Sequence, residues 1–273
     1  MNLASKFTIY ALLFIFLAYS IFPLYIAVSA SLKDRRELFL DPLGFPDRLH
    51  FENYAKAFNS TNLKQAYVNS SILVLGTIAG VLVTAIPAAY ALAKINFRFN
   101  SLLIGYFFFC TTIPAQLSII PLYFMFSKLH LTNSFIGLIL LYIASFTPFS
   151  ILLMRSYFVS IPNELLEAAL IDGASTWQAF WKIIFPVARP GVITTVVIVS
   201  MWSWNNFILP LTFINKQNLT PVTVAIAILR GKWSAAWEVI MAASILGALP
   251  IGILFAILHR RFIAGLAGTG LKG

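Results

Sequence analysis

The chain has 273 residues, of which 60% are hydrophobic and 10% are charged, and its mean hydropathy is +0.87. Soluble proteins carry about 25% charged residues, so this composition excludes a soluble enzyme and indicates a membrane protein. The formal net charge is +10, but the basic residues are scattered between apolar runs instead of forming one patch, and nucleic acid is therefore not expected as a partner.

Six uncharged stretches follow one another along the chain. A helix needs about 20 apolar residues to cross a hydrocarbon core about 30 Å thick, and in lipid every backbone polar group must be satisfied internally. The sequence lacks the alternating ten-residue segments of a membrane β-barrel. We therefore expect an all-α, polytopic membrane protein with a single transmembrane domain over residues 1–273 and six transmembrane helices: Phe7–Leu32, Ala66–Ala93, Phe99–Ser127, Leu131–Met154, Pro190–Asn215 and Val239–Leu258.

The first apolar stretch has two features of a secretory signal, because Lys6 precedes it and Val28-Ser29-Ala30 resembles a small-residue cleavage site. The apolar part of a signal peptide has about 7–15 residues, and Phe7–Leu32 is much longer. This length favours a retained transmembrane helix over a cleaved signal. Residues 33–65, which follow, combine mixed charge with two prolines and several aromatic residues, and they predict an ordered loop outside the membrane.

The third apolar stretch contains Thr111, Thr112, Pro114 and Gln116 close together. A proline inside a helix removes one backbone hydrogen bond and kinks the chain. Polar side chains at such a kink either face a translocation path or make hydrogen bonds to neighbouring helices. Helix–helix bonding is favoured, and Gln116 remains a candidate for the path.

The segment Ser160–Pro190, between the fourth and fifth stretches, predicts two short helices. In the first, Pro162 suits the first helical turn and Glu164 complements the positive end of the helix dipole. This helix is expected to end at Asp172-Gly173, where glycine permits the left-handed backbone of a C-terminal cap.

The second short helix is expected to start at Ser175, because Ser175 and Gln178 have the spacing of a capping box. Its apolar residues recur at helical spacing until Pro186 ends the helix, and they are Trp177, Phe180, Trp181 and Ile184. Neither helix is long enough to span a membrane. Their apolar faces must therefore be covered either by a protein partner or by the lipid headgroup layer.

Several residues of this segment follow a characteristic order: Glu167-Ala168-Ala169, then Gly173, then Ile184-Phe185-Pro186. This order resembles the signature loop of ABC importer permeases, although that family commonly has leucine at the position of Phe185. The longer string EAALIDGAS…FWKIIFPVARPG is similar to the carbohydrate-uptake branch, whose best-known member is the maltose transporter. The tail Phe262–Gly273 looks like the end of the second, MalG-like permease subunit of that transporter.

The resemblance implies a role for the segment. In this family the loop is cytoplasmic and docks, through a short coupling helix, onto the ATP-hydrolysing subunit. The residues expected to couple to the ATPase are then Glu167, Ala168, Ala169, Asp172, Gly173, Ser175, Trp177, Phe180 and Pro186.

The resemblance also implies an orientation in the membrane. With residues 160–190 as a cytoplasmic ATPase-docking loop, an even number of spans puts both termini in the cytoplasm, and residues 33–65 and 216–239 become extracytoplasmic loops. The lysines and arginines divide almost evenly between the two sides, so the positive-inside rule alone leaves the orientation open.

The fifth apolar stretch contains the sequence Trp202-Ser203-Trp204-Asn205-Asn206. At about 1.5 Å per residue, Asn205 lies about 20 Å along a helix from Gly191, beyond the middle of the membrane. Either the indoles stack on sugar rings and the amides bind hydroxyl groups, or these residues bond and pack between helices. The second interpretation is favoured, because in the resembling transporters the other permease subunit is expected to hold most substrate contacts. The translocation-path candidates are Gln116, Trp202, Trp204, Asn205 and Asn206.

The segment Lys216–Val239, after the fifth stretch, is polar, and near its middle are Arg230, Gly231, Lys232 and Trp233. The resemblance implies that these four residues contact an extracytoplasmic solute-binding protein. The alternative is a solvated loop with a tryptophan at the membrane interface.

The energy source is expected to lie outside this chain, because the sequence has no G-x-x-x-x-G-K-[ST] motif to hold ATP phosphates. A secondary transporter would need ionisable residues inside its spans, and the six stretches contain none. A membrane enzyme would need paired carboxylates or a nucleophile and base, and no such pair is convincing. The single Cys110 and the widely separated histidines give no metal site.

These observations and the resemblance predict a non-catalytic permease subunit of a binding-protein-dependent ABC importer for a sugar or oligosaccharide, in a prokaryotic plasma (inner) membrane. The expected partners are a second, homologous permease subunit, two ATP-binding cassette subunits that carry the ATP and Mg²⁺, an extracytoplasmic solute-binding protein and membrane lipid. Glycerol-phosphate importers share the signature, so a polyol phosphate is an alternative cargo. A secondary transporter or a channel is a more distant alternative.

Overall fold

The computed structural model describes residues 3–60, 62–232 and 236–270, and within these ranges the regular structure is helical, without β-strands. Four helices are long and apolar enough to cross a membrane: Ser5–Ser31, Leu63–Lys94, Phe135–Ser160 and Trp237–His259. Two pairs of shorter helices, each bent at a break, bring the number to six if each pair forms one span. The predicted all-α, multi-pass architecture is confirmed.

The described residues form two compact units, one drawn from Met1–Ala66 and Val224–Pro250 and the other from Tyr67–Thr223 and Ile251–Gly273. Three elements run through both units, namely α4 (Leu63–Lys94), α13 (Val222–Lys232) and α14 (Trp237–Gly270). Each unit is described by itself.

In the first unit, the segment after α1 (Leu3–Ser31) is ordered and contains α2 (Arg35–Leu40) and α3 (Glu52–Ser60). Lys33 is fully buried, and its Nζ donates a hydrogen bond to the backbone carbonyl of Asp41. The side-chain amide of Asn53 donates to the carbonyls of Ser31 and Lys33, at 3.0 and 2.9 Å. These bonds tie the end of α2 and the start of α3 to the residues at the end of α1. By contrast, between residues 5 and 28 no side chain of α1 is buried.

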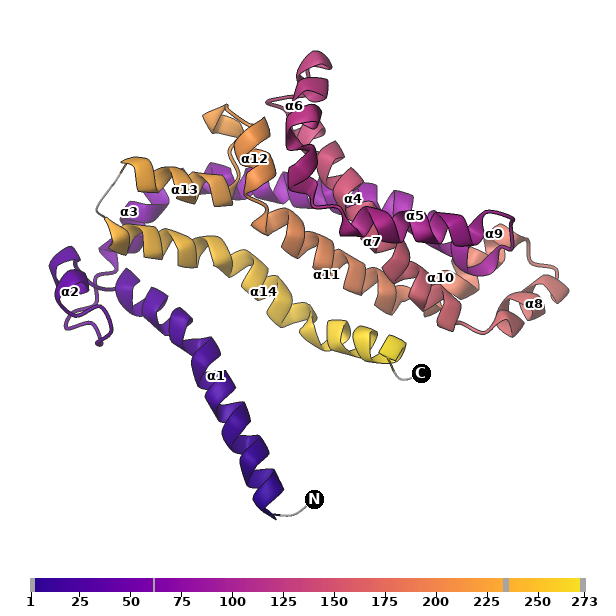
Figure 1. Cartoon of the computed structure of the whole chain (residues 1–273), viewed down its shortest axis with the longest axis horizontal. Helices are drawn as coiled ribbons and strands as arrows, with labels where there is room; N and C mark the ends of the chain where they lie inside the picture. Colours follow the sequence, from indigo (N-terminus) through magenta and orange to yellow (C-terminus); the bar gives the residue numbers. More distant parts are fainter. Residues whose placement is uncertain (1–2, 61, 233–235, 271–273) are drawn as a thin grey trace. The chain divides into compact units, whose positions relative to one another are not determined.

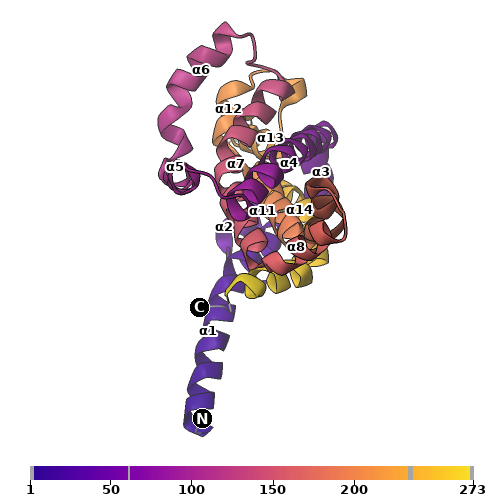
Figure 2. The same cartoon turned by 90° about the vertical axis from the view of Figure 1, so that its right-hand side faces the viewer.

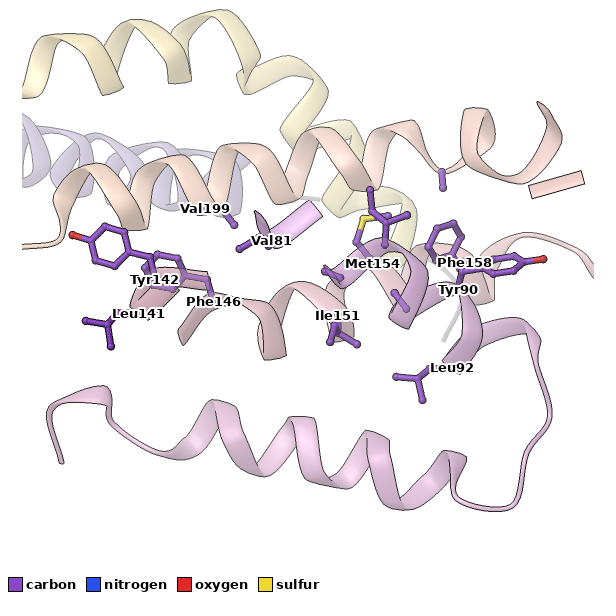
Figure 3. Close-up of a cluster of buried hydrophobic side chains, with 14 of the residues drawn as sticks. Val81, Tyr90, Leu92, Leu141, Tyr142, Phe146, Ile151, Met154, Phe158 and Val199 are labelled. Carbon is purple, nitrogen blue, oxygen red and sulfur yellow. The ribbon is translucent and has the colours of Figure 1, made fainter. Parts of the chain in front are cut away.

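The second unit is built around the packing of α4 and α11 (Arg189–Asn205) on α7 (Phe135–Ser160). Figure 3 shows part of the apolar core, with Tyr90 and Phe158 near one end and Tyr142 and Phe146 near the other. The ring centroids of these two aromatic pairs are 5.7 and 5.6 Å apart.

Two glycines bring α4 and α7 close together. A Cβ at Gly76 would lie 2.6 Å from Cδ1 of Ile139, and one at Gly80 would overlap Cδ1 of Ile143. Glycine therefore lets the isoleucines of α7 approach the backbone of α4, as small residues do in membrane helix pairs.

The third apolar stretch is two helices and not one. α5 (Asn100–Thr112) ends before Pro114, the 3₁₀ turn η1 (Ala115–Ser118) follows, and α6 (Ile119–Lys128) leaves at an angle of 86°. Figure 2 shows α6 turning away from α5. The predicted kink at Pro114 is confirmed, but the chain bends far more than a simple proline kink would require.

The fifth stretch also differs from the single helix predicted over Pro190–Asn215. α11 ends at Asn205, Asn206 has an extended backbone, and the short helix α12 (Ile208–Phe213) follows. The break coincides with two consecutive asparagines, whose side chains compete with the helix for backbone hydrogen bonds.

Candidate coupling and translocation sites

The segment between α7 and α11 lies at one end of these helices, and α12 lies at the other end (Figure 1). The first helix of the segment between α7 and α11 is α8, which covers Asn163–Ile171 and follows Pro162 at the N-cap. Gly173 has a φ of +84°. Its N–H donates to the carbonyl of Leu170 at 3.1 Å, and the N–H of Ala174 donates to the carbonyl of Ala169 at 3.0 Å. This pair of bonds is a Schellman motif, so the predicted glycine cap is confirmed.

The second short helix starts two residues after Gly173, with the predicted capping box. The Oγ of Ser175 accepts the N–H of Gln178 at 3.2 Å, and Oε1 of Gln178 accepts the N–H of Ser175 at 2.9 Å. Together the two caps close one helix and open the next within three residues, which makes a sharp and well-defined corner.

The sequence predicted that the second short helix ends at Pro186, but the helix continues past this residue. α9 (Thr176–Ala179) continues as a π-helical turn, η2 (Phe180–Ile184), and then as α10 (Phe185–Val187). Because a proline ring clashes with the carbonyl four residues earlier, a wider turn before Pro186 accommodates it. The sharp bend of 69° comes later, between Val187 and Arg189.

The apolar residues of this helix face two ways, which corrects the prediction of one outward face. Phe180 and Ile184 are buried in the protein's own core, where the ring of Phe180 lies 4.7 Å from that of Tyr90. Trp177 points outward, with 70% of its surface exposed, and so does Ile171 at the end of α8, with 85% exposed. The outward apolar surface of this segment therefore includes Ile171, Trp177 and Trp181, whereas Phe180 and Ile184 are covered by the protein itself.

The other expected coupling residues divide in the same way. Ala169 is buried and Pro186 is half-buried, whereas the exposed members are Glu167, Ala168, Asp172, Gly173 and Ser175. An apolar cavity of about 690 Å³ is lined by the exposed Trp177 and Trp181 on one side and by Ile86, Pro87 and Tyr90 of α4 on the other. The indoles thus have little packing on the side of this cavity and are available to a partner.

A second cavity, of about 340 Å³, brings together polar groups that are far apart in the sequence. It is lined by Ala115, Gln116, Ile119 and the run Asn205–Leu209. The break between α5 and α6 supplies Gln116, and the break after α11 supplies the asparagines. Three of the predicted path residues, Gln116, Asn205 and Asn206, thus converge from two separate helix breaks.

Two amides at this cavity, those of Gln116 and Asn205, have both side-chain polar atoms unbonded within the described residues. Both side chains are exposed. Asn206 is different, because its Oδ1 accepts the N–H of Leu209 at 3.2 Å and its carbonyl accepts the hydroxyl of Thr223 at 2.8 Å. Asn206 therefore shapes the break, whereas Gln116 and Asn205 present donors and acceptors to the cavity.

The tryptophans of the fifth stretch pack against neighbouring aromatic rings, and neither is among the residues that line this cavity. The ring of Trp202 lies 5.4 and 4.9 Å from the rings of Phe146 and Phe149. Trp204 is buried and stacks on Tyr67, with ring centroids 6.2 Å apart. This is the arrangement that the interhelical interpretation predicted for the two indoles.

The segment Lys216–Val239, predicted as a polar loop, is largely helical, with a short 3₁₀ turn η3 (Gln217–Leu219) before α13. Gly231 lies exposed near the end of α13. The side chains of Arg230 and Lys232, and the whole of Trp233, lie outside the described residues, so the expected binding-protein contact stays a prediction.

The close contact of α4 with α7 at Gly76 and Gly80 was not predicted from the sequence. A signal was present, since the two glycines form a G-x-x-x-G pattern inside an apolar stretch, which marks a close helix–helix contact.

Comparison with known proteins places this architecture in a family. Residues 72–267 match the family described as binding-protein-dependent transport system inner membrane component. The chain belongs to this family. The matched range contains both the segment Ser160–Pro190 and the residues of the polar cavity. The resemblance to ABC importer permeases and the multi-pass inner-membrane location are confirmed.

Individual relatives match over nearly the whole chain. The sulfoquinovosyl glycerol transport system permease protein SmoH of Agrobacterium fabrum is 34% identical over 260 residues, with 95% of this chain and 91% of the relative covered. The diacetylchitobiose uptake system permease protein NgcG of Streptomyces coelicolor is 32% identical over 263 residues, with 96% and 87% covered. A chain of a bacterial ABC transporter that imports the acidic polysaccharide alginate has the same fold, with a TM-score of 0.81, 22% identity and coverage of 96% and 99%.

Proposed function

We propose that this chain is a transmembrane permease subunit of an ABC importer and forms half of the path for a sugar or oligosaccharide. The observation that carries the proposal is the pairing, within one compact unit, of an exposed docking corner and a polar cavity formed at two helix breaks. Relatives named for transport of sulfoquinovosyl glycerol and diacetylchitobiose support a carbohydrate as cargo.

The docking corner suits a coupling element, with Ile171 and Trp177 outward and Gly173 at the turn. Large exposed apolar and aromatic side chains on a rigid, doubly capped corner are typical anchors for a partner protein. The partner would be one of two ATP-binding cassette subunits, which bind ATP and Mg²⁺, while this subunit itself hydrolyses nothing. This assignment puts the corner and both chain termini in the cytoplasm, with residues 33–65 and 216–239 outside.

The polar cavity suits hydroxyl groups. Gln116 and Asn205 each offer an amide donor and a carbonyl acceptor, and the residues that line the cavity carry no charge. Neutral amides match a sugar better than a polyol phosphate, which would call for basic side chains. A second permease subunit would complete the path, and an extracytoplasmic binding protein would deliver the solute; a solved alginate importer contains such a periplasmic protein.

The proposal is tested by co-purifying the chain with its partner subunits and measuring uptake in proteoliposomes. Asn205→Leu should lower solute uptake about threefold to tenfold, the cost of one or two neutral hydrogen bonds, and Gln116→Leu should act similarly. Thr112→Val is the matched control, because its hydroxyl already bonds to the carbonyl of Phe109 in its own helix. Uptake that falls equally in the control, or not at all in the cavity variants, would argue against this path.

The purified chain without partners should hydrolyse no ATP, and solute with its binding protein should stimulate ATPase activity only in the assembled complex. ATP hydrolysis by the chain alone, or ATP-independent uptake by it, would exclude the proposed role.

A further inference from the structure

A third cavity, separate from the docking corner and the path, contains two arginines. It has a volume of about 530 Å³ and lies where α4 ends and α5 begins, beside the last turns of α7. Its lining residues are Asn96, Phe97, Arg98, Asn100, Ser101, Ile104 and Arg155.

The two arginines are held in place by the surrounding chain. The Nε of Arg155 donates to the carbonyl of Leu92 at 3.2 Å, and the amide of Asn100 donates to the same carbonyl at 3.3 Å. The guanidinium of Arg98 lies 5.8 Å from the ring centre of Phe99. Because the bond of Arg155 uses its Nε, the two terminal amino groups of that side chain keep their donors for a ligand.

The cavity has positive charge without a matching carboxylate. Among the described residues, no acidic side chain lines it and neither arginine forms an ion pair. The nearby Lys94 is engaged elsewhere, because its Nζ donates to the carbonyl of Ile161 and to Oδ1 of Asn163. Two guanidinium groups that share one cavity repel each other, and an anion between them relieves this repulsion.

The start of α5 adds to the positive potential. The helix has 13 residues, and Phe99 at its N-cap has no side-chain acceptor for the first backbone N–H groups. Ser101, in the first turn, lines the same cavity. The uncapped helix end and the arginines therefore favour the same kind of ligand, a phosphate group.

The surface next to the cavity indicates where the phosphate comes from. Phe99, Leu102 and Tyr106 are large exposed residues at the start of α5, a helix without charged residues. A phospholipid whose headgroup enters the cavity can lay its acyl chains along this face. We propose that Arg98 and Arg155 bind the phosphate of an anionic phospholipid at the membrane surface. Only the assignment of this surface to the inner leaflet rests on the proposed function.

The test uses the purified full chain in bilayer nanodiscs and spin-labelled lipid probes. Wild-type protein should immobilise phosphatidylglycerol in preference to phosphatidylcholine. Arg98→Gln should lower this preference about fivefold, as expected for one basic residue at an anionic membrane surface. Arg155→Lys keeps the charge but loses the fixed guanidinium, and it should have an intermediate effect. Arg48→Gln is the matched control, because Arg48 is exposed in the other unit and should leave the preference unchanged.

Inorganic phosphate distinguishes the two sources of the ligand. If the arginines hold a lipid, phosphate added to the nanodiscs should not release the immobilised phosphatidylglycerol. If phosphate releases it, and binds wild type but not Arg98→Gln in phosphatidylcholine discs, the cavity is a phosphate site filled by a soluble anion and the lipid assignment is overturned. Equal immobilisation of both lipids by wild type, or an unchanged preference in Arg98→Gln, would overturn the site itself.

Discussion

At the residue scale, Gly173 decides the shape of the docking corner. Its φ of +84° is in the left-handed region, and a Cβ there would meet no atom within 4 Å. The demand on this position is therefore conformational and not steric. The left-handed conformation costs residues other than glycine about 1–2 kcal/mol. The cost is smaller for asparagine, which adopts this conformation more often than most residues.

This difference predicts distinct effects of two substitutions. Gly173→Val should tilt the second helix, displace Trp177 and lower ATP-driven uptake by about tenfold or more, since small misplacements of positioned groups have large effects on rate. Gly173→Asn should keep most of the uptake. Both variants are compared by uptake and ATPase rate in the reconstituted complex. Equal activity of the valine and wild-type proteins would mean that the corner is not needed for coupling.

Lys33 is the second residue with a testable role. It is fully buried, and its Nζ donates a hydrogen bond to the carbonyl of Asp41. Lys33→Met removes the donor and leaves that carbonyl unsatisfied, which should destabilise the segment 33–65 by about 1–3 kcal/mol and speed its cleavage in limited proteolysis. Lys56→Met, at an exposed lysine of α3, is the control and should change little. Identical cleavage rates for both variants would contradict the anchoring role.

At the element scale, the close packing of α4 on α7 depends on small residues. Gly80→Leu would drive a side chain into Ile143 and should lower the free energy of unfolding by about 1–3 kcal/mol, measured as a lower Tm in detergent. Combining it with Ile143→Ala should restore part of the loss, because the two side chains share one space.

Gly105 of α5 provides the comparison for this prediction. A Cβ at Gly105 meets no atom within 4 Å, so Gly105→Leu should change stability by less than about 0.5 kcal/mol. If Gly80→Leu and Gly105→Leu have the same Tm, the contact with Ile143 does not limit the packing of these helices.

The sequence predicted elements well where a local signal acts alone. Gly173 and the capping box of Ser175 and Gln178 specify their caps through residues within a few positions, and the structure has both. The inward direction of Phe180 and Ile184 could not be predicted, because helical spacing defines an apolar face without saying which neighbour covers it. For Phe180 the neighbours are Tyr90 and Phe158, which belong to the long helices α4 and α7.

At the scale of the whole molecule, the polar cavity depends on tertiary structure. Gln116 and Asn205 were separate candidates in the sequence, and only the positions of two helix breaks bring them to one site. The proline predicted a break at Pro114, but nothing in the sequence predicted a bend as large as 86°. The end of α11 at Asn205 lies inside an uninterrupted uncharged stretch, so hydropathy alone predicts a longer helix.

The orientation in the membrane is the last property to test. It follows here from the docking corner, since the basic residues divide evenly and give no bias. In a Cys110→Ala background, single cysteines are placed at Asn218, in the turn η3, and at Asn96, between α4 and α5; both positions are exposed. An impermeant maleimide applied to intact cells should label Asn218→Cys and leave Asn96→Cys unmodified. In inside-out vesicles the pattern should reverse, which shows that both thiols are reactive. Labelling of Asn96→Cys from outside would invert the topology, and the corner around Gly173 could then not reach a cytoplasmic ATPase.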